Sequence, residues 1–500
     1  MQQLIKAICW DCRIESVSVV AILKSFERLK GIYITESDDI YTAIHDKMFD
    51  IISAAIAPYI MKCLIEHIDI SFLASRTYLS SFTQKSVPFV IHIPQQLESL
   101  YLERQMKEAM EGKYWEVFGS IQTENEAYRK LLLSILEEQD TFQQIFQNSV
   151  ENGKTPLYVS SYLGYIDFVE YFVVQCPYYI KVKDKEGRSP FYVACKKGHI
   201  AVVRYLTKYN EDINAHDVNN TTALSATCLN GHSVVAQLLL DNNADINKTN
   251  KINQDTLHHV CLSGNVKLVK LLLFGEYNVD TTKRDIYGRS SLHAACFKGH
   301  TEVVKLLIGF GLDINETSNL GSTPLFEACR NGQYDTVKYL FDLNGQTLNS
   351  RVETTIKNEK GWSVLHAACQ NGHCEVVKFL IGAVMNPNDT TNVGYTPLYK
   401  ACEHGHCEIV KYLIDLNNQI LNSRVDTTIK RENGCSALNT SCQKGNIDVV
   451  KLLIDAGMNP NDTSNGGMTP LNYASREGRY DTVKFLLDLN GRTINSRVDN

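Results

Sequence analysis

Gly321-Ser-Thr-Pro-Leu-Phe-Glu-Ala-Cys-Arg-Asn-Gly332 is the stretch of sequence from which the fold can be inferred. After the opening glycine, Thr323 is a good helix N-cap, and Pro324 stands at the first helical position, where its missing N–H costs nothing. Gly332 then ends a helix of two turns in the left-handed conformation. An amphipathic run follows in each unit, as in Glu302–Ile308, so the pattern predicts a turn, a short helix, a tight turn and a longer helix.

This unit occurs ten times after residue 150, mostly at intervals of 33 to 35 residues. The turn positions are Gly153, Gly187, Asn220, Asn253, Gly288, Gly321, Gly361, Gly394, Gly434 and Gly467. In all ten units a second glycine stands eleven residues after the turn. Helix pairs of this kind bury their apolar faces only against their neighbours, so the repeats predict an all-α solenoid of ten helix-turn-helix repeats.

These units resemble the ankyrin repeat, whose mark is Gly-x-Thr-Pro-Leu-His-x-Ala. Good copies are Gly321–Ala328, Gly394–Ala401 and Gly288–Ala295, and the resemblance covers residues 151–500. It implies β-turns along one edge and short helices on a concave face, both of which bind protein partners. The histidine of the motif remains only as His258, His293 and His366. Tyr, Phe, Ser or Asn replaces it elsewhere, so we expect weaker hydrogen bonds between successive turns in those units.

Two units are longer, and they show that a pair of repeats was duplicated. Gly288–Lys360 and Gly361–Asn433 both span 73 residues, and their long loops end in the same Leu-Asn-Ser-Arg sequence at Arg351 and Arg424. A third copy begins and stops at Asn500, so we expect a truncated tenth repeat without a capping repeat. One hypothesis is that the loops around Arg351 and Arg424 form a periodic contact surface. In the alternative, they look alike only because they were copied.

The first 150 residues contain no repeat. Ser16–Gly31 predicts an amphipathic helix, Ile32–Thr35 a short strand, and the His45-Asp46 pair opens a helix over Lys47–Ala57. This order resembles the winged-helix end of STAND-type signalling ATPases, and we expect residues 1–87 to be such a winged-helix-like remnant. Residues 88–150 are expected to form a helical linker to the repeats of residues 151–500.

The linker is expected to contain helices over Gln96–Glu111 and Thr123–Glu138. A STAND ATPase also needs a phosphate-binding Gly-x-x-x-x-Gly-Lys-Ser/Thr loop. Gly153-Lys154-Thr155 lacks the leading glycine of that loop, because Asn148 takes its place, and it coincides with the first repeat turn. If the resemblance holds, the ATPase core lies upstream of Met1.

Composition excludes several classes of partner. The net charge of −6 gives no electrostatic reason for binding nucleic acid or an anionic membrane. The most apolar stretch, Met48–Met61, is too short to span a bilayer. Met1–Ile14 lacks the features of a secretory signal, so we expect a cytoplasmic protein.

The fifteen cysteines are expected to be reduced. Eight stand eight residues after a turn, on the predicted buried side of the first helix: Cys195, Cys228, Cys261, Cys296, Cys329, Cys369, Cys402 and Cys442. Helix spacings of about 8–10 Å are too wide for bridges between repeats. Cys9 and Cys12 lack a second pair for zinc. We therefore expect no metal, no other cofactor and no catalytic set, and hence no enzyme and no small-molecule substrate.

The resemblance places the solvent-facing positions of a binding surface at the turn tips and near the end of the short helix. We expect the protein-binding residues to be Tyr287, Arg289, Phe297, Arg330, Trp362, Gln370, Tyr395 and Glu403, together with Arg351 and Arg424 in the long loops. Alternatively, some tip aromatics pack on the next turn.

The sequence predicts a protein-interaction scaffold, the sensor or docking part of a STAND-type protein. The rival hypotheses are a substrate adaptor of a ubiquitin ligase and an enzyme regulated by ankyrin repeats. In the latter case the first 150 residues would have to carry the active site.

Overall fold

The structure is a computed structural model and describes residues 61–62, 65–66, 69–82, 91–138, 153–209, 212–343, 351–416 and 424–495. The elements predicted over Ser16–Gly31, Ile32–Thr35 and Lys47–Ala57 lie outside these residues, as do Cys9 and Cys12. The chain forms two compact units. Unit 1 comprises residues 1–223 and 241–244, and unit 2 comprises residues 224–240 and 245–500.

Unit 1 contains a two-stranded parallel sheet that the sequence analysis did not predict. Strand β1 (Thr77–Leu79) pairs with β2 (Ile91–Ile93), with Thr77 opposite Ile91 and Leu79 opposite Ile93. The prediction that residues 88–150 are only helical is therefore wrong at β2. Two isoleucines in alternation ahead of Pro94 favour a short strand, and Leu79 and Ile93 are fully buried. Strands β1 and β2 lie on either side of residue 88, where the linker is predicted to begin. The domain boundaries themselves stay a prediction.

The helices around this sheet begin later than predicted. Pro94 is followed by a 3-10 turn over Gln95–Leu97, so α5 begins at Glu98 rather than Gln96 and ends at Met110. A second 3-10 turn occupies Ile121–Glu124 and delays α7, which spans Glu126–Glu138 instead of beginning at Thr123. Two further helices, α4 (Ile70–Arg76) and the unpredicted α6 (Tyr114–Phe118), complete this part of unit 1.

Helix α6 covers the open side of the first repeat, which consists of α9 (Pro156–Leu163) and α10 (Ile166–Gln175). The ring of Phe118 is fully buried and meets Phe168 and Phe172 edge to face, with centroids 5.5 and 5.1 Å apart. Helix α7 also contacts α10, and Arg129 bonds Asp167 at 2.7 Å. Helices α6 and α7 thus act as an N-terminal cap that shields the apolar face of the first repeat. Unit 1 continues with the second repeat, α11 (Pro190–Lys197) and α12 (Ile200–Leu206).

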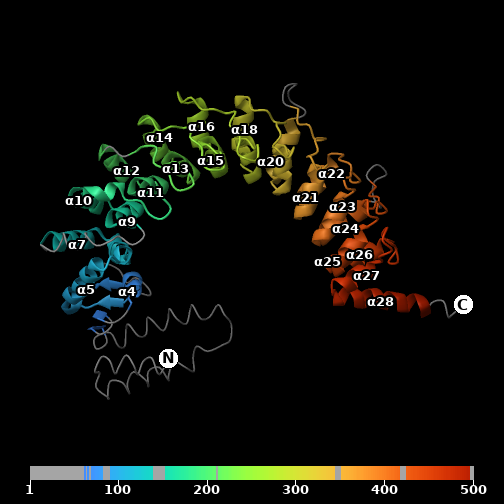
Figure 1. Ribbon diagram of the computed structural model, residues 1–500, viewed down its shortest axis with the longest axis horizontal. Helices are drawn as coiled ribbons and strands as arrows, with labels where there is room; N and C mark the ends of the chain where they lie inside the picture. Colours follow the sequence, from blue (N-terminus) through green and yellow to red (C-terminus); the bar gives the residue numbers. More distant parts are fainter. Residues whose placement is uncertain are drawn as a thin grey trace, which may run out of the picture. The chain divides into compact units, whose positions relative to one another are not determined.

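Unit 2 consists of two rows of helices, one formed by the first helix of each repeat and one by the second (Figure 1). The first row contains α13 (Ala223–Leu229), α15 (Thr256–Ser263), α17 (Ser291–Lys298), α19 (Pro324–Arg330), α21 (Val364–Asn371), α23 (Pro397–His404), α25 (Ala437–Lys444) and α27 (Pro470–Arg476). The second row contains α14 (Ser233–Asp241), α16 (Val266–Phe274), α18 (Thr301–Phe310), α20 (Tyr334–Asp342), α22 (Cys374–Gly382), α24 (Cys407–Asp415), α26 (Ile447–Asp455) and α28 (Tyr480–Asn495).

The turn chemistry predicted from the sequence is confirmed. All ten turn residues have a positive φ, and so do all ten glycines between the helices of a repeat. Thr323 was predicted as an N-cap, and the side chain two residues after the turn accepts a hydrogen bond from the first helical turn in eight repeats: Thr155, Ser189, Asp255, Ser290, Thr323, Thr396, Ser436 and Thr469. These bonds fix where each first helix begins, and with it the face that the helix exposes.

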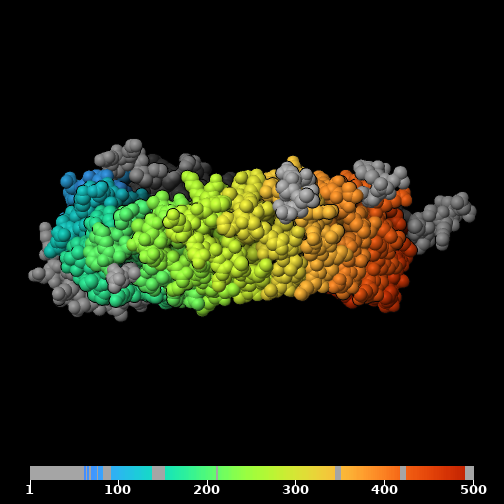
Figure 2. Space-filling view, turned by 90° about the horizontal axis from the view of Figure 1, so that it is seen from above, coloured from blue at the N-terminus to red at the C-terminus, as the bar shows by residue number. Residues whose placement is uncertain are grey.

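The core of unit 2 lies between the two rows. In α18, Val303, Val304 and Leu307 are fully buried, whereas Glu302 and Lys305 face outward and pair with each other. Seen from above, the repeats of unit 2 form an unbroken packed surface (Figure 2). The predicted all-α ankyrin solenoid is therefore confirmed as the fold class.

Candidate protein-binding surface

The exposed side of the first-helix row of unit 2, together with the turns ahead of these helices, contains two cavities. Backbone bonds between successive turns hold this surface in register. Asn319 N–H donates to the carbonyl of Tyr287 at 2.9 Å, and Glu359 N–H donates to that of Leu320 at 2.9 Å. The side chains that follow each turn residue are thus placed at fixed intervals along the row.

The Trp362 cavity lies between the sixth and seventh repeats and has a volume of about 290 Å³. It is lined by Leu320, Ser322, Phe326, Arg330, Asn358, Lys360, Trp362, Ala367, Gln370 and Asn371. Three predicted binding residues, Arg330, Trp362 and Gln370, therefore meet in one place. The Arg330 guanidinium is exposed and pairs with no acid among the described residues. Apolar walls beside an unpaired cation suit a side chain from another protein.

The backbone of its turn sets the position of Trp362. Asn358 closes the turn by accepting at Oδ1 from Trp362 N–H at 2.9 Å, and its own N–H donates to the Trp362 carbonyl at 3.0 Å. The indole is half-buried, and its ring contacts the Lys400 ammonium 4.9 Å from the ring centroid. One side of the ring is therefore held by the protein, while the residue still lines the cavity.

Tip aromatics of neighbouring turns form a ladder with basic side chains. Lys400 Nζ lies 3.7 Å from the Tyr395 ring centroid, and the Arg431 guanidinium lies 4.4 Å from the same ring. Lys400 also bonds Glu403 at 2.7 Å. Tyr395 and Glu403 thus hold the basic side chains of Lys400 and Arg431 in place. For Tyr395 this agrees with the alternative, in which some tip aromatics pack on the next turn. Tyr395 and Glu403 line neither of the two cavities.

The Glu327 cavity has a volume of about 200 Å³. Its lining consists of Gln254, His258, Leu262, Asp285, Arg289, Ser290, His293, Ala294, Phe297 and Glu327. It brings together two more predicted residues, Arg289 and Phe297. Arg289 Nε donates to Asp285 Oδ2 at 2.9 Å, and the guanidinium stacks 4.8 Å from the Tyr287 ring centroid. Tyr287 itself is exposed and lines neither cavity.

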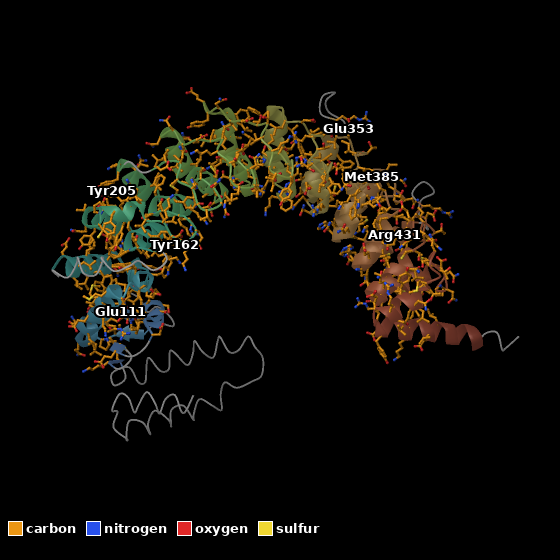
Figure 3. The ribbon with its side chains drawn as sticks, in the orientation of Figure 1. Glu111, Tyr162, Tyr205, Glu353, Met385 and Arg431 are labelled. Carbon is orange, nitrogen blue, oxygen red and sulfur yellow. The ribbon has the colours of Figure 1, made fainter. Side chains whose placement is uncertain are left out.

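The long-loop arginines lie apart from the cavities. Arg351 and Arg424 are both exposed, and their carbonyls accept from Asn315 Nδ2 at 2.7 Å and Asn388 Nδ2 at 2.6 Å. The duplicated sequence thus has a duplicated anchor. Figure 3 shows the side chains of unit 2, with Glu353, Met385 and Arg431 labelled in chain order along the repeats.

Sequence reasoning missed Glu327 and Lys400, which occupy the same position of the duplicated repeat pair. Both stand six residues after a turn residue and both are buried. A signal was present, because most units have Ala, Val or Thr at this position. A charge at a small, half-apolar position is a departure that calls for a partner.

The motif histidines link successive turns as the resemblance implies. Nε2 of His293 lies 2.9 Å from the Ser322 carbonyl, and Nε2 of His366 lies 2.8 Å from that of Tyr395. Asn439 replaces the motif histidine in its repeat, and its Nδ2 donates to the Met468 carbonyl at 3.3 Å. This longer bond agrees with the predicted weakening. The prediction of weaker bonding is wrong at Tyr158, whose hydroxyl donates to Asp184 Oδ2 at 2.7 Å, because the longer tyrosine reaches a carboxylate.

Burial makes His366 acid-sensitive. Loss of hydration lowers its pKa to about 4, and the positive charges of Lys357 and Lys400 act in the same direction. Below the unfolded pKa of about 6.5 the unfolded chain binds a proton that the folded chain rejects, so stability is full above that pH and falls toward pH 4. We expect protonation of His366 to lower the free energy of unfolding by about 3 kcal/mol as the pH falls from about 6.5 to about 4. At His258 burial opposes the charge, but the Asp255 carboxylate outweighs it and raises the pKa.

His366→Asn is expected to abolish this contribution, because an amide replaces the imidazole as it does naturally at Asn439. Urea unfolding of both proteins at pH 7 and pH 5 measures the effect. The variant should be the less stable protein at pH 7 and should lose less stability on acidification. An equal loss in the two proteins would contradict the assignment.

The repeat cysteines lie where the sequence predicts. All eight are buried free thiols, and burial raises the pKa of Cys442 to about 12, so none is poised as a thiolate. Within the described ranges, no three His, Cys, Asp or Glu side chains gather as metal ligands. No helix of the described part of the chain combines the length and the apolar character that a bilayer crossing requires.

The fold and its exposed surface define a helical repeat protein of the binding type. The family described as "Ankyrin repeats (3 copies)" matches residues 161–250, 257–352, 346–423 and 415–498. The description "Ankyrin repeats (many copies)" matches residues 231–273. The chain therefore belongs to the ankyrin-repeat family, which implies a protein–protein interaction scaffold.

A short segment is also similar to alpha-latrocrustotoxin-Lt1a of Latrodectus tredecimguttatus. The two proteins are 32% identical over 73 residues. This segment is 15% of the present chain and 5% of the toxin, so the chain matches only a small part of that relative.

Proposed function

We propose that the scaffold binds a protein partner through the Trp362 and Glu327 cavities, with the turns around them as the rim. The observation that supports this most strongly is the meeting of Arg330, Trp362 and Gln370 with the apolar side chains of Leu320 and Phe326 in one cavity. Partly buried aromatic rings beside an unpaired guanidinium are the composition of interface hot spots. An apolar side chain of the partner fills the Trp362 cavity.

The long-loop edge around Arg351 and Arg424 is proposed as a second contact surface. The asparagine anchors of the two loops support it, because they present the two exposed arginines in the same way, one repeat pair apart. A partner with a matching internal spacing would contact both.

The proposal extends to the context of the scaffold. We propose that it is the sensor or docking part of a STAND-type signalling protein, supported by the order of predicted elements in residues 1–87. A cytoplasmic location is part of the same proposal and is supported by the buried free thiols, which fit a reducing compartment. ATP binding by a chain extended upstream of Met1, and none by the present chain, is the expected result. A ubiquitin-ligase adaptor role has no observation in its favour.

Trp362→Asp is expected to weaken partner binding by about tenfold or more without unfolding the repeats. Random linear peptides displayed on phage are selected against the intact protein, and the affinities of the enriched peptides are measured by calorimetry. Trp115→Asp is a control, because Trp115 is an exposed tryptophan of unit 1.

Circular dichroism melts of the variants check that the repeats stay folded. The double variant Arg351→Ala, Arg424→Ala, in the same assay, tests the long-loop edge. Unchanged affinity of Trp362→Asp, or a failure of the wild type to enrich any peptide, would contradict the proposed surface.

A further inference from the structure

Glu327 is a buried acid whose side chain bonds no other residue in the described part of the chain. The residue is 4% exposed, and its Oε2 is buried without a hydrogen bond. No ion pair joins it to another described residue, although it lies on α19 at the wall of the Glu327 cavity. Burying a carboxylate in this way is costly, and Arg330, three residues further along α19, lines the other cavity and does not pair with it. The arrangement therefore calls for a cation from a partner.

The other acids around this cavity are all matched. Asp285 holds the Arg289 guanidinium at 2.7 Å, Glu316 pairs with Arg284 at 3.0 Å, and Asp255 lies 2.7 Å from the His258 ring. Arg289 is therefore occupied and does not reach Glu327. The cavity keeps one uncompensated negative charge.

The duplicated copy of this repeat pair shows a cation satisfied at the same position. Lys400 replaces Glu327 there, 73 residues further on. Its ammonium is 8% exposed, bonds Glu403 at 2.7 Å and lies against the rings of Tyr395 and Trp362. In that copy acid, cation and rings all come from this chain. In the first copy the charges at these two positions are exchanged, because Glu327 is followed three residues later by Arg330, but no ion pair joins the two among the described residues.

The rest of the cavity suits the stem of a long basic side chain. Leu262 and Phe297 offer apolar walls to its methylene groups, and the Phe297 ring can receive the charged end. The exposed Lys298 approaches that ring at 5.6 Å, but it does not line the cavity. The volume of about 200 Å³ is several times the roughly 30 Å³ that a water molecule occupies.

We infer that the Glu327 cavity takes a lysine or arginine side chain of the protein partner, with Glu327 as its counter-ion. This inference rests on the proposed function and adds to it the chemistry of one anchor residue. The neighbouring Trp362 cavity, with its unpaired Arg330, carries the opposite charge, so the two cavities fix the direction in which a partner segment lies.

The test uses the same random linear peptides displayed on phage, selected against the intact wild-type protein. The enriched peptides are expected to share a basic residue at one position. Glu327→Gln should weaken the binding of these peptides by about 30-fold or more, because it removes the counter-ion and keeps the shape of the cavity. A selection against Glu327→Lys should replace the shared basic residue by an acidic one. Glu302→Gln is the matched control, since Glu302 already pairs with Lys305 on the outer helix row.

Stability distinguishes a binding role from a structural one. Because the charge of Glu327 is unmatched in the free protein, Glu327→Gln should melt at the same temperature as the wild type or higher, whereas a structural role predicts a lower one. Enriched peptides without a shared basic residue, or peptides insensitive to Glu327→Gln, would overturn the inference and leave the proposed function standing. No enrichment at all would overturn both.

Self-association of the wild type that Glu327→Gln abolishes would assign the cavity to a second copy of this chain and overturn the inference. Sedimentation of both proteins at several concentrations provides that measurement.

Discussion

Replacing Phe118 by alanine is expected to lower the free energy of opening of the first repeat by about 3–5 kcal/mol. The ring is fully buried between α6 and α10 and meets Phe168 and Phe172 edge to face. Its loss opens a cavity at a contact that covers the apolar side of that repeat. Native-state hydrogen exchange of the α9 and α10 amides measures the change.

Repeat arrays transmit such damage only to neighbours, so exchange in α25 and α26 should not change. Trp115→Ala is the control on the same helix. Trp115 is 38% exposed, and we expect its replacement to cost about 1 kcal/mol. Equal effects of the two substitutions would show that α6 does not act as a cap.

Replacing Gly332 by alanine is expected to destabilise the sixth and seventh repeats by about 2–3 kcal/mol. Gly332 has a φ of +70°, which strains any residue with a Cβ. The added methyl group would also lie 2.4 Å from His373 Nδ1, in a ring whose Nε2 bonds the Arg330 carbonyl at 2.9 Å. The substitution therefore costs both backbone strain and an inter-repeat hydrogen bond. Urea unfolding measures it.

Two substitutions in unit 2 serve as controls for that experiment. Gly309 lies in α18 with open space where a Cβ would stand, so Gly309→Ala should stabilise the protein by about 0.5–1 kcal/mol. Val384 has a φ of +63° and is 82% exposed, so Val384→Gly should relieve strain at no loss of packing and stabilise by about 1 kcal/mol. If all three changes had the same sign, φ would not be the cause.

The two binding proposals and the Phe118 test concern different parts of the chain. Phe118 lies in unit 1, whereas Trp362 and Glu327 lie in unit 2 on the exposed side of the first-helix row. Because repeat arrays couple only nearest neighbours, Phe118→Ala should leave peptide affinity unchanged. Trp362→Asp should correspondingly leave α9 and α10 protected.

The sequence alone determined the repeats. The twenty residues that need a positive φ, the caps such as Thr323 and the buried position of the eight cysteines follow from local rules, because each is decided within one unit of about 33 residues. The sequence also selected Arg330, Trp362 and Gln370 as exposed. It missed strand β2 and helix α6, since a three-residue strand and a five-residue helix carry little periodic signal and form through tertiary contacts.

Only the tertiary structure decided which side chains meet. The Trp362 cavity joins residues more than 40 positions apart, from Leu320 to Gln370, and neither Tyr287 nor Tyr395 reaches it. Whether a charge is matched also depends on side-chain placement that the sequence does not record: Lys400 pairs with Glu403 three residues on, whereas Glu327 and Arg330 at the same two positions do not pair. Contacts between repeats are set by side-chain length and packing, and local propensity contains no record of them.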